Sequence, residues 1–466
     1  MKEILRCSAT SQASLVRRRK VSSRELTAAH LERIAEVDPK LHATVEVLAA
    51  RALAEADAAD AALARGETVG PLHGVPFSTK DSMELAGTVC TAGTVGRSGA
   101  AASTEDAALV ARLRRAGGIP IAKTNLPDLL FAFESDNLLF GRTNNPYGLD
   151  RTSGGSSGGE AALIAACGSP LGLGSDAAGS VRLPAAFCGI AGIKPTSGRL
   201  PRTGHFPPAG GWIEALWQIG PMARRVEDLV TVMPLLAAPD EYDPTAVGMP
   251  APDPAAVSLR GLRAAFYTDN GLAAAQPEVA EVVRAAARSL AADTACMDEA
   301  RPACLAAAYD LEMKLLGPDG GDSVRRYLAD LGSTRVHPLL TGWLDKLEPY
   351  RTDLAGLEGY WAEWDAYRAE MFAFLRRYDV LLAPAYTQPA LVHGASMRDE
   401  NFRGFSHTMA YNVAGWPAAV VRCGESAEGL PIAVQVAAGP WREDRVLAVA
   451  WALERNFGGW KAPESI

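Results

Sequence analysis

Two serines, Ser156 and Ser180, lie 24 positions apart in this chain of 466 residues, each beside residues with little or no side chain. The first stands in the run 154–159, Gly-Gly-Ser-Ser-Gly-Gly, and the second ends the run 177–180, Ala-Ala-Gly-Ser. Such runs let the backbone turn sharply and approach another group closely, and they leave main-chain N–H groups open to an incoming carbonyl oxygen. The flanking sequence therefore decides what the two serines can do.

A strand is predicted before Ser180 and a helix after Ser156. Residues 171–175 form a short apolar segment that ends at the tight turn, which favours a strand leading to Ser180. Residues 160–166 are rich in alanine, which predicts a helix that begins beside Ser156, where free N–H groups and the helix dipole favour negative charge. Taken alone, the Ser180 segment is equally well interpreted as a structural turn with a capping serine.

Lys80 comes directly after residues 75–79, which predict a short buried strand. A lysine at the end of such a strand is desolvated, and its pKa of ~10.4 must fall by roughly three units for the amine to be neutral near pH 7, which burial can achieve. A neutral lysine can serve as the base for a serine in place of a histidine. The ordinary alternative is a surface lysine. Together, the two serines and Lys80 point to acyl-transfer hydrolysis.

The run that begins at Gly154 matches two other motifs in part. A phosphate-binding loop needs a lysine after the last glycine, and because Glu160 stands there, that interpretation fails. Residues 154–158 also match G-x-S-x-G, the nucleophile elbow of α/β-hydrolases, which needs a strand directly before it. Residues 144–151 are turn-like, so an elbow built on Ser156 is the second choice. Its histidine partner would be His205, His337, His393 or His407.

Strand and helix signals alternate along the chain, which predicts an α/β fold with a large mixed central sheet covered by helices on both faces. A proline-rich stretch at 239–254 is either a surface crossover or a linker, and residues 311–377 are helical and rich in Trp and Tyr, mostly for core packing. Further helices are predicted at 22–65, 105–116 and 447–457, and the first of these begins with a capping box at Ser22–Glu25. Further strands are predicted at 119–123, 259–266, 380–384, 418–421 and 432–436.

Composition excludes several classes of function. A hydrophobic content of 48% and a charged content of 21% are ordinary for a soluble enzyme, and the net charge of −8 argues against a nucleic-acid or anionic-membrane partner. No apolar stretch approaches the ~20 residues of a membrane span, and no secretory signal is expected. Seven scattered cysteines without a C-x-x-C pair indicate neither a zinc site nor a disulfide framework, so we expect a cytoplasmic protein that needs no metal or cofactor.

Taken together, these segments resemble the amidase signature family, in its fatty-acid-amide-hydrolase-like and bacterial amidase branch. The resemblance is dense from about residue 72 to 230, returns near the carboxyl end, and is weak between about 240 and 379. The matching stretches are 74–81, 123–125, 140–146, 153–160, 173–189, 192–196, 412–418 and 429–435.

The resemblance implies that Ser180 is the nucleophile, Ser156 a bridging serine that follows a cis peptide bond, and Lys80 the base. It also implies an oxyanion hole of backbone N–H groups from Ala177, Ala178, Gly179 and Ser180, and a substrate-contacting loop at Leu130, Phe131 and Ala132. Many members have glycine where Ala178 stands, so φ there must be negative. Asp176 and Arg182 are predicted to form a structural pair, and Glu160 resembles the fatty-acid-amide branch.

The family resemblance predicts one domain in four parts: an N-terminal helical region (1–70), the signature core (71–239), a variable helical segment that lines or caps the pocket (240–379), and a C-terminal part of the same sheet (380–466). The predicted activity is hydrolysis of C–N bonds in small amides with hydrophobic or aryl groups, extending to carbamates (urethanes) and esters, by a monomer or homodimer. The apolar loop at 130–132 and the nearby Trp212 and Trp217 favour such groups. A glutaminase-type subunit of a tRNA-dependent amidotransferase and a non-catalytic binding relative are the alternatives.

Overall fold

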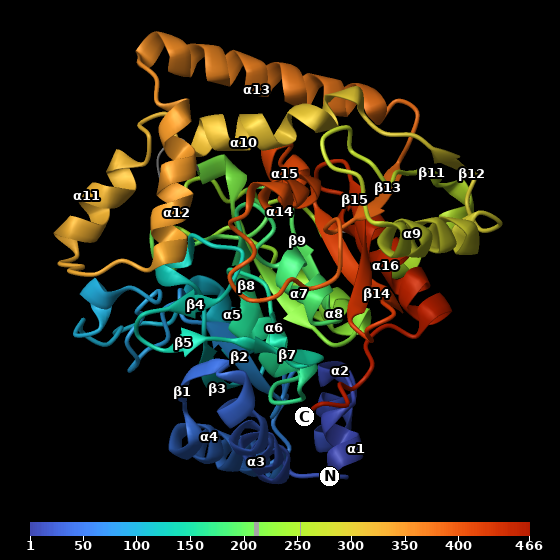
Figure 1. Ribbon diagram of the computed structural model, residues 1–466. Helices are drawn as coiled ribbons and strands as arrows, with labels where there is room; N and C mark the ends of the chain where they lie inside the picture. The colour runs from blue at the N-terminus through green and yellow to red at the C-terminus, as the bar shows by residue number, and fades with distance from the viewer. Residues whose placement is uncertain (209–213, 252) are drawn as a thin grey trace.

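A mixed sheet of 11 strands runs through the described residues of this computed structural model, which are 1–208, 214–251 and 253–466 (Figure 1). Neighbours are parallel from β3 through β2 to β8 and from β13 through β11 to β12, and antiparallel elsewhere, which confirms the predicted mixed sheet. In sheet order the strands are β1 (Thr44–Val47), β3 (Ile119–Thr124), β2 (Pro76–Lys80), β8 (Leu171–Asp176), β10 (Gln218–Ala223), β9 (Ala191–Lys194), β14 (Ala418–Glu425), β15 (Pro431–Ala438), β13 (Val380–Pro384), β11 (Arg263–Phe266) and β12 (Cys296–Glu299).

Helices cover both faces of this sheet, as predicted. Two series pack along it: α3, α6 and α7 in one, and α5, α8, α16 and α9 in the other. The helices are α1 (Lys2–Leu5), α2 (Ala9–Arg17), α3 (Ser23–Leu41), α4 (Ala49–Ala64), α5 (Ala108–Arg115), α6 (Gly158–Ala165), α7 (Arg182–Phe187), α8 (Val226–Leu236), α9 (Pro277–Leu290), α10 (Ala308–Leu316), α11 (Asp322–Asp330), α12 (Pro338–Leu347), α13 (Leu354–Phe374), α14 (Asp399–Phe402), α15 (Ser406–Val413) and α16 (Glu443–Phe457).

Several of these helices and strands can be explained by individual contacts. Ser22 caps α3, and both halves of the predicted capping box with Glu25 are present. Every residue of β2 and β8 is buried, as expected for central strands covered on both faces. Glycine is required in β8 because a Cβ at Gly172 would lie 1.7 Å from Glu160 Oε1 on α6. The strands beside Lys80 and Ser180 can therefore pack closely against the helix that begins beside Ser156.

Three segments differ from their prediction. The helical segment expected at 22–65 is divided into α3 and α4 by β1 (Thr44–Val47), whose β-branched residues pair with β3 at the edge of the sheet. The strand expected at 259–266 begins only at Arg263, because residues 259–261 form a 3₁₀ turn. The turn-like stretch at 144–151 contains the short hairpin of β6 (Asn144–Asn145) and β7 (Gly148–Thr152), while β4 (Asp136–Asn137) and β5 (Gly141–Arg142) form a second hairpin. Because β7 pairs with β6 and, through Arg151, with Val392, and is not a strand of the 11-stranded sheet, the strand before Ser156 lies outside the central sheet, unlike the strand of a nucleophile elbow.

The helices from α10 to α13, gold to orange in Figure 1, lie over one end of the sheet. Before them, β11, β12 and α9 extend the sheet itself, so residues 240–379 contribute both an edge of the sheet and the helices above it. Trp343 of α12 packs on Phe133 and Phe402, with ring centroids 4.9 and 5.1 Å apart, and thereby joins these helices to the core.

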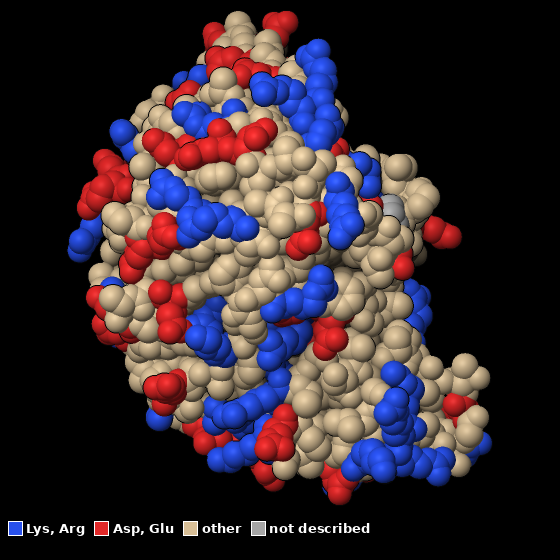
Figure 2. Space-filling model, turned by 90° about the vertical axis from the view of Figure 1, so that its right-hand side faces the viewer, with Lys and Arg blue, Asp and Glu red and all other residues tan. Residues whose placement is uncertain are grey.

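Two further features are the distribution of charge on the surface and the composition of the helices. Lys and Arg side chains are interspersed with Asp and Glu across the face shown in Figure 2. Within the described ranges, every helix is too short or too polar to cross a membrane.

Candidate active site

The Lys80 amine is fully buried at the end of β2 and contacts two serine hydroxyls. Its Nζ lies 2.7 Å from Ser156 Oγ and 3.1 Å from Ser175 Oγ. Burial lowers the pKa of this amine well below its ordinary value, while the charges of Asp176 and Glu160 act in the opposite direction. The amine is therefore shifted toward the neutral form, which can accept a proton.

The loop that holds Ser156 is fixed by close backbone packing. The peptide bond from Gly155 to Ser156 is cis, as the family resemblance predicts. A Cβ on Gly155 would lie 2.6 Å from Ala132 O, so glycine is required for this approach. The Ser135 hydroxyl donates to Gly154 O at 3.1 Å and accepts from Gly158 N–H at 2.9 Å. Ser156 thus has a defined position, with 2% of its surface exposed.

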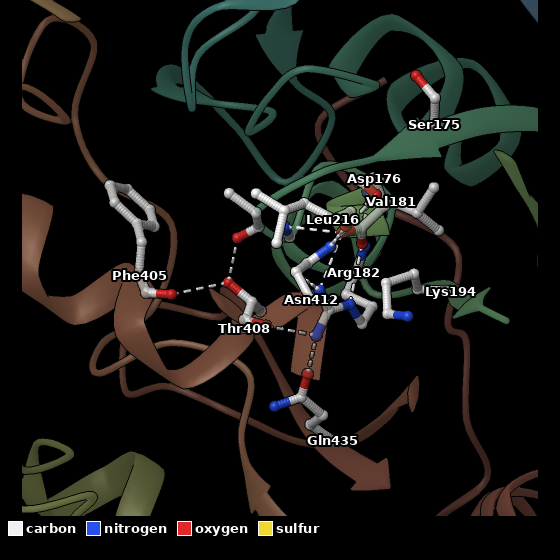
Figure 3. A network of polar contacts seen from close by, with 12 residues as sticks. Ser175, Asp176, Val181, Arg182, Lys194, Leu216, Phe405, Thr408, Asn412 and Gln435 are labelled. Carbon is white, nitrogen blue, oxygen red and sulfur yellow. Dashed lines mark hydrogen bonds and ion pairs between the residues drawn. The ribbon is translucent and has the colours of Figure 1, made fainter. Parts of the chain in front are cut away.

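Ser180 lies in the turn between β8 and α7. A buried ion pair of Asp176 and Arg182 holds this turn (Figure 3). The Arg182 guanidinium donates to both oxygens of Asp176 at 2.9 Å, which confirms the predicted pair. Asp176 also accepts from the N–H groups of Gly179 and Val181, at 2.8 and 3.2 Å. The pKa of Asp176 lies below its usual range, because the charge and hydrogen bonds of Arg182 outweigh the effect of burial.

Three backbone donors of this turn have no partner among the described residues: the N–H groups of Ala177, Ala178 and Ser180. The Gly179 N–H differs, because it already donates to Asp176. Gly179 has a φ of +126°, and a Cβ there would lie 2.3 Å from Thr408 Oγ1. Ala178 is absent from the residues with positive φ, so alanine fits at that position.

Ser156 and Ser180 both open into one pocket with mostly apolar walls. It encloses about 780 Å³ of empty space, a figure that includes open solvent at its mouth. Its described lining includes the predicted loop residues Leu130, Phe131 and Ala132, and also Trp217. Trp212 lies outside the described residues. The described residues of the lining are Leu129, Leu130, Phe131, Ala132, Ser156, Ser175, Asp176, Ala177, Ala178, Ser180, His205, Pro207, Pro208, Leu216, Trp217, Leu316 and Trp343.

Residues on α10 and α12 form part of the wall of this pocket. Leu316 and Trp343 lie in its wall, and the Phe131 ring meets Trp343 edge-on with centroids 6.1 Å apart. The predicted aromatic segment 311–377 therefore contributes one of its tryptophans to the pocket. The loop that carries Phe131 has left-handed backbone at Leu129 and Leu130, with φ values of 50° and 68°.

The sequence analysis did not single out Ser175, and it named His205 only as one of four histidines that could serve an elbow built on Ser156. Ser175 Oγ lies 3.1 Å from Lys80 Nζ and 3.0 Å from His205 Nε2, so His205 contacts Ser175 and not Ser156. The only signal for Ser175 was its place at the end of the strand that precedes Ser180. The other three histidines contact different groups: His337 with Asp136 and Leu339, His393 with Leu149, and His407 with Ala273.

A second buried carboxyl lies behind Lys80. Glu160 of α6 accepts from the hydroxyl of Ser78, and from Thr124 Oγ1 at 2.7 Å. Burial raises its pKa to about 7, while the hydrogen bonds from Ser78 and Thr124 and the charge of Lys80 act in the opposite direction. The pKa values of Lys80 and Glu160 are therefore both shifted in the direction that favours the neutral form near pH 7.

Comparison with known proteins places this chain in a family. The family model described as Amidase matches residues 25–447. Human fatty-acid amide hydrolase 2 is 32% identical, with 99% of this chain and 91% of the relative covered. A glutamyl-tRNA(Gln) amidotransferase subunit of Moorella thermoacetica is 33% identical, with 97% of each covered. A solved structure of 6-aminohexanoate cyclic dimer hydrolase complexed with substrate has a TM-score of 0.87 and 27% identity, covering 99% of each chain.

The mixed sheet thus holds a buried lysine and two serines beside a pocket with mostly apolar walls. The chain belongs to the amidase signature family, and it is a hydrolase that acts on the C–N bonds of amides.

Proposed function

We propose that this enzyme hydrolyses amides with hydrophobic or aryl groups through Ser180, Ser156 and Lys80. The observation that carries the proposal is the buried Lys80 amine 2.7 Å from Ser156 Oγ, at a pocket that Ser180 also lines. A base must lie within hydrogen-bond reach of the proton it accepts, and this pair meets that requirement. Ser180, which is 8% exposed, is the more accessible of the two serines to a substrate.

In the proposed mechanism, neutral Lys80 takes a proton from Ser156 while Ser156 takes one from Ser180. Ser180 Oγ attacks the carbonyl carbon, and the carbonyl electron pair moves onto oxygen. The free N–H groups of Ala177, Ala178 and Ser180 stabilise this oxyanion, and the Gly179 N–H is shared with Asp176.

The tetrahedral intermediate then collapses and the C–N bond breaks. Ser156 gives its proton to the departing nitrogen and recovers one from Lys80, which leaves an ester on Ser180. Water attacks that ester, losing its proton through Ser156 to Lys80, and releases the acid as Ser180 regains its proton. Every step uses side chains and N–H groups of this chain, so we propose a reaction without metal or cofactor.

The pocket lining favours uncharged, hydrophobic substrates. We propose that Leu130, Phe131 and Ala132 contact the acyl or the amine portion, with Trp343 and Trp217 on the other walls. The same machinery attacks any activated carbonyl, so carbamates and esters of the same shape are also proposed substrates. We further propose that the enzyme works in the cytoplasm as a monomer or homodimer, and the seven free cysteines support a reducing compartment.

A glutaminase-type subunit of a tRNA-dependent amidotransferase is the second candidate, favoured by the similarity to the amidotransferase subunit of Moorella thermoacetica. Glutamine would bring an α-ammonium and an α-carboxylate into the pocket. Among the described lining residues the only carboxylate, Asp176, is bound to Arg182, and no lysine or arginine is present. Burying unpaired charges in such a site is costly, so the hydrophobic amide is the better candidate.

The test compares Ser180→Ala, Ser156→Ala and Lys80→Ala on the 4-nitroanilide of hexanoic acid. We expect Ser180→Ala to abolish release of 4-nitroaniline, and we expect the wild type to carry an acyl adduct on Ser180 when mixed with 4-nitrophenyl hexanoate, detected by peptide mass spectrometry. Retained activity in Ser180→Ala, with loss in Ser156→Ala and a histidine variant, would establish the elbow mechanism instead. Glutamine hydrolysis without anilide hydrolysis would favour the amidotransferase function.

A further inference from the structure

His205 is the one histidine in the described lining of the pocket, and the proposed mechanism does not use it. It lies two residues before Pro207, after a loop that returns the chain to the Lys80 side of the pocket. Its two ring nitrogens have different partners: Nδ1 is 3.1 Å from Pro207 O, and Nε2 is 3.0 Å from Ser175 Oγ. The imidazole is buried, with 6% of the residue exposed, and its ring packs against Trp217.

The Pro207 contact fixes the tautomer of His205. A carbonyl oxygen can only accept, so Nδ1 must carry the proton that it donates to Pro207 O. Burial is the main cause that lowers the pKa of His205 to about 3, against the opposing effect of the hydrogen bond to Pro207 O, so the ring is neutral and Nε2 has a free lone pair. Because Nε2 can then only accept, the Ser175 hydroxyl donates its proton to His205.

This arrangement determines what Ser175 can offer to Lys80. With its proton engaged by His205, Ser175 Oγ presents only lone pairs to Lys80 Nζ, 3.1 Å away, and so accepts an N–H from the amine. A neutral amine has a single lone pair. With one N–H held by Ser175, that lone pair is left for the proton of Ser156, 2.7 Å from Nζ.

We propose that His205 is a positioning residue for the amide hydrolysis: by holding the Ser175 proton, it prevents Ser175 from donating to Lys80 and so directs the Lys80 lone pair to Ser156. This inference rests on the proposed role of Lys80 as the base. Without His205, the Ser175 hydroxyl can rotate and compete with Ser156 for the one lone pair. The charged groups facing this chain of contacts are Asp176 and Glu160 around Lys80, and Arg202 near His205.

The test is a double-mutant cycle of His205→Phe and Ser175→Ala on the 4-nitroanilide of hexanoic acid. His205→Phe should lower kcat by about 3- to 10-fold, the equivalent of one competing hydrogen bond, with little change in KM. In the double variant the competing hydroxyl is gone, so its kcat should be no lower than that of Ser175→Ala alone. Independent, multiplicative losses would mean that His205 acts only by packing on Trp217, and would overturn the proposal.

The pH dependence of kcat/KM separates the two explanations by sign. In His205→Phe, a Ser175 hydroxyl that donates to the neutral amine stabilises it, so the acid limb should move to lower pH. If the substitution only loosened packing, water would reach Lys80, raise the pKa of the amine and move the limb to higher pH, against the proposal. His205→Gln, whose amide oxygen can accept from Ser175, should recover most of the kcat lost in His205→Phe.

Two controls keep the outcome interpretable. His205→Leu also lacks the acceptor and takes the place of His205→Phe if that variant does not fold. Lys80→Ala and Ser180→Ala are measured in the same assay. If they retain activity, the proposed function itself fails, whereas if they are inactive and the cycle is multiplicative, only the role of His205 fails.

Discussion

Asp176 and Arg182 form an ion pair with no exposed side-chain surface, and this pair joins the Ser180 turn to the last third of the chain. Beyond Asp176, Arg182 donates to Thr408 O at 2.9 Å and to Gln435 Oε1 at 2.8 Å (Figure 3). Asn412 also donates to Asp176, at 2.9 Å. Side chains from α15 and β15 therefore hold the turn that presents Ser180, although more than 220 residues separate them from Arg182.

Asp176→Asn should strongly destabilise the enzyme, because Arg182 would remain buried without its counter-ion. Removing one partner of a buried pair costs about 3–5 kcal/mol. Urea unfolding measures this loss. The double variant Asp176→Asn/Arg182→Met should lose less than the sum of the two single variants, since neither charge is then left unpaired. Strict additivity would show that the two side chains do not act as a pair.

Lys80→Met should lower activity by about 10²- to 10⁴-fold, the usual contribution of a general base, and should raise stability at pH 7. The folded-state pKa of Lys80 lies well below 10.5 because of burial, so between the two values the unfolded chain binds a proton that the folded protein does not. Wild-type stability therefore rises with pH through this window. The advantage of Lys80→Met should shrink between pH 7 and 9 in urea unfolding. Lys461→Met, at a lysine whose side chain is 60% exposed, is the control and should show neither effect.

Glu160→Gln should remove a pH dependence of stability with the opposite sign. Burial raises the folded-state pKa of Glu160 from 4.5 to about 7, so the folded protein binds the extra proton between these values and stability falls as pH rises through them. The loss across this window is about 3 kcal/mol. Unfolding of Glu160→Gln, measured from pH 4.5 to 8, should lack this fall. An unchanged slope would mean that Glu160 is ionised in the folded enzyme at pH 5.

The short-range features of this site could be predicted from local patterns, whereas the contact between Lys80 and Ser156, 76 positions apart, could be predicted only from the family resemblance. The strand, turn and ion pair around Ser180 all lie between residues 171 and 182, so composition and spacing suffice. The contact between Ser175 and His205 spans 30 positions, and it depends on how the loop after β9 returns over the pocket. No local pattern encodes that return.

Backbone conformation is the second kind of feature that could not be predicted from the sequence. Leu129 and Leu130 have left-handed φ values, which β-carbon sterics disfavour at leucine, so nothing in the residue types indicates them. They are set by tertiary contacts such as Leu129 N–H donating to Ala92 O at 2.9 Å. The family resemblance identified this loop as substrate-contacting, but its shape follows only from the structure.

Gly179→Ala should abolish most activity even though the change adds one methyl group. The new Cβ would lie 2.3 Å from Thr408 Oγ1 at a φ of +126°, so the turn must move and carry its N–H groups away from the oxyanion. Loss of one such donor lowers kcat by about 10²- to 10³-fold. Gly87→Ala is the matched control, since φ is +82° there but nothing lies within 4 Å of the added Cβ. Equal losses of kcat in the two variants would contradict the role of this turn.

Phe131→Ala should change the preference for acyl length more than it changes catalysis itself. The Phe131 ring lines the pocket edge-on to Trp343, at a centroid distance of 6.1 Å, so its removal takes away apolar contact that a long acyl chain uses and a short one does not. We expect the ratio of kcat/KM for the 4-nitroanilides of hexanoic and acetic acid to fall by about 10-fold, within the range for one apolar contact. Phe372→Ala is the control, since Phe372 is 51% exposed on α13 and is not in the pocket wall. A uniform loss on both anilides in Phe131→Ala would instead indicate that the loop positions Ser156 through Ala132, whose carbonyl approaches Gly155.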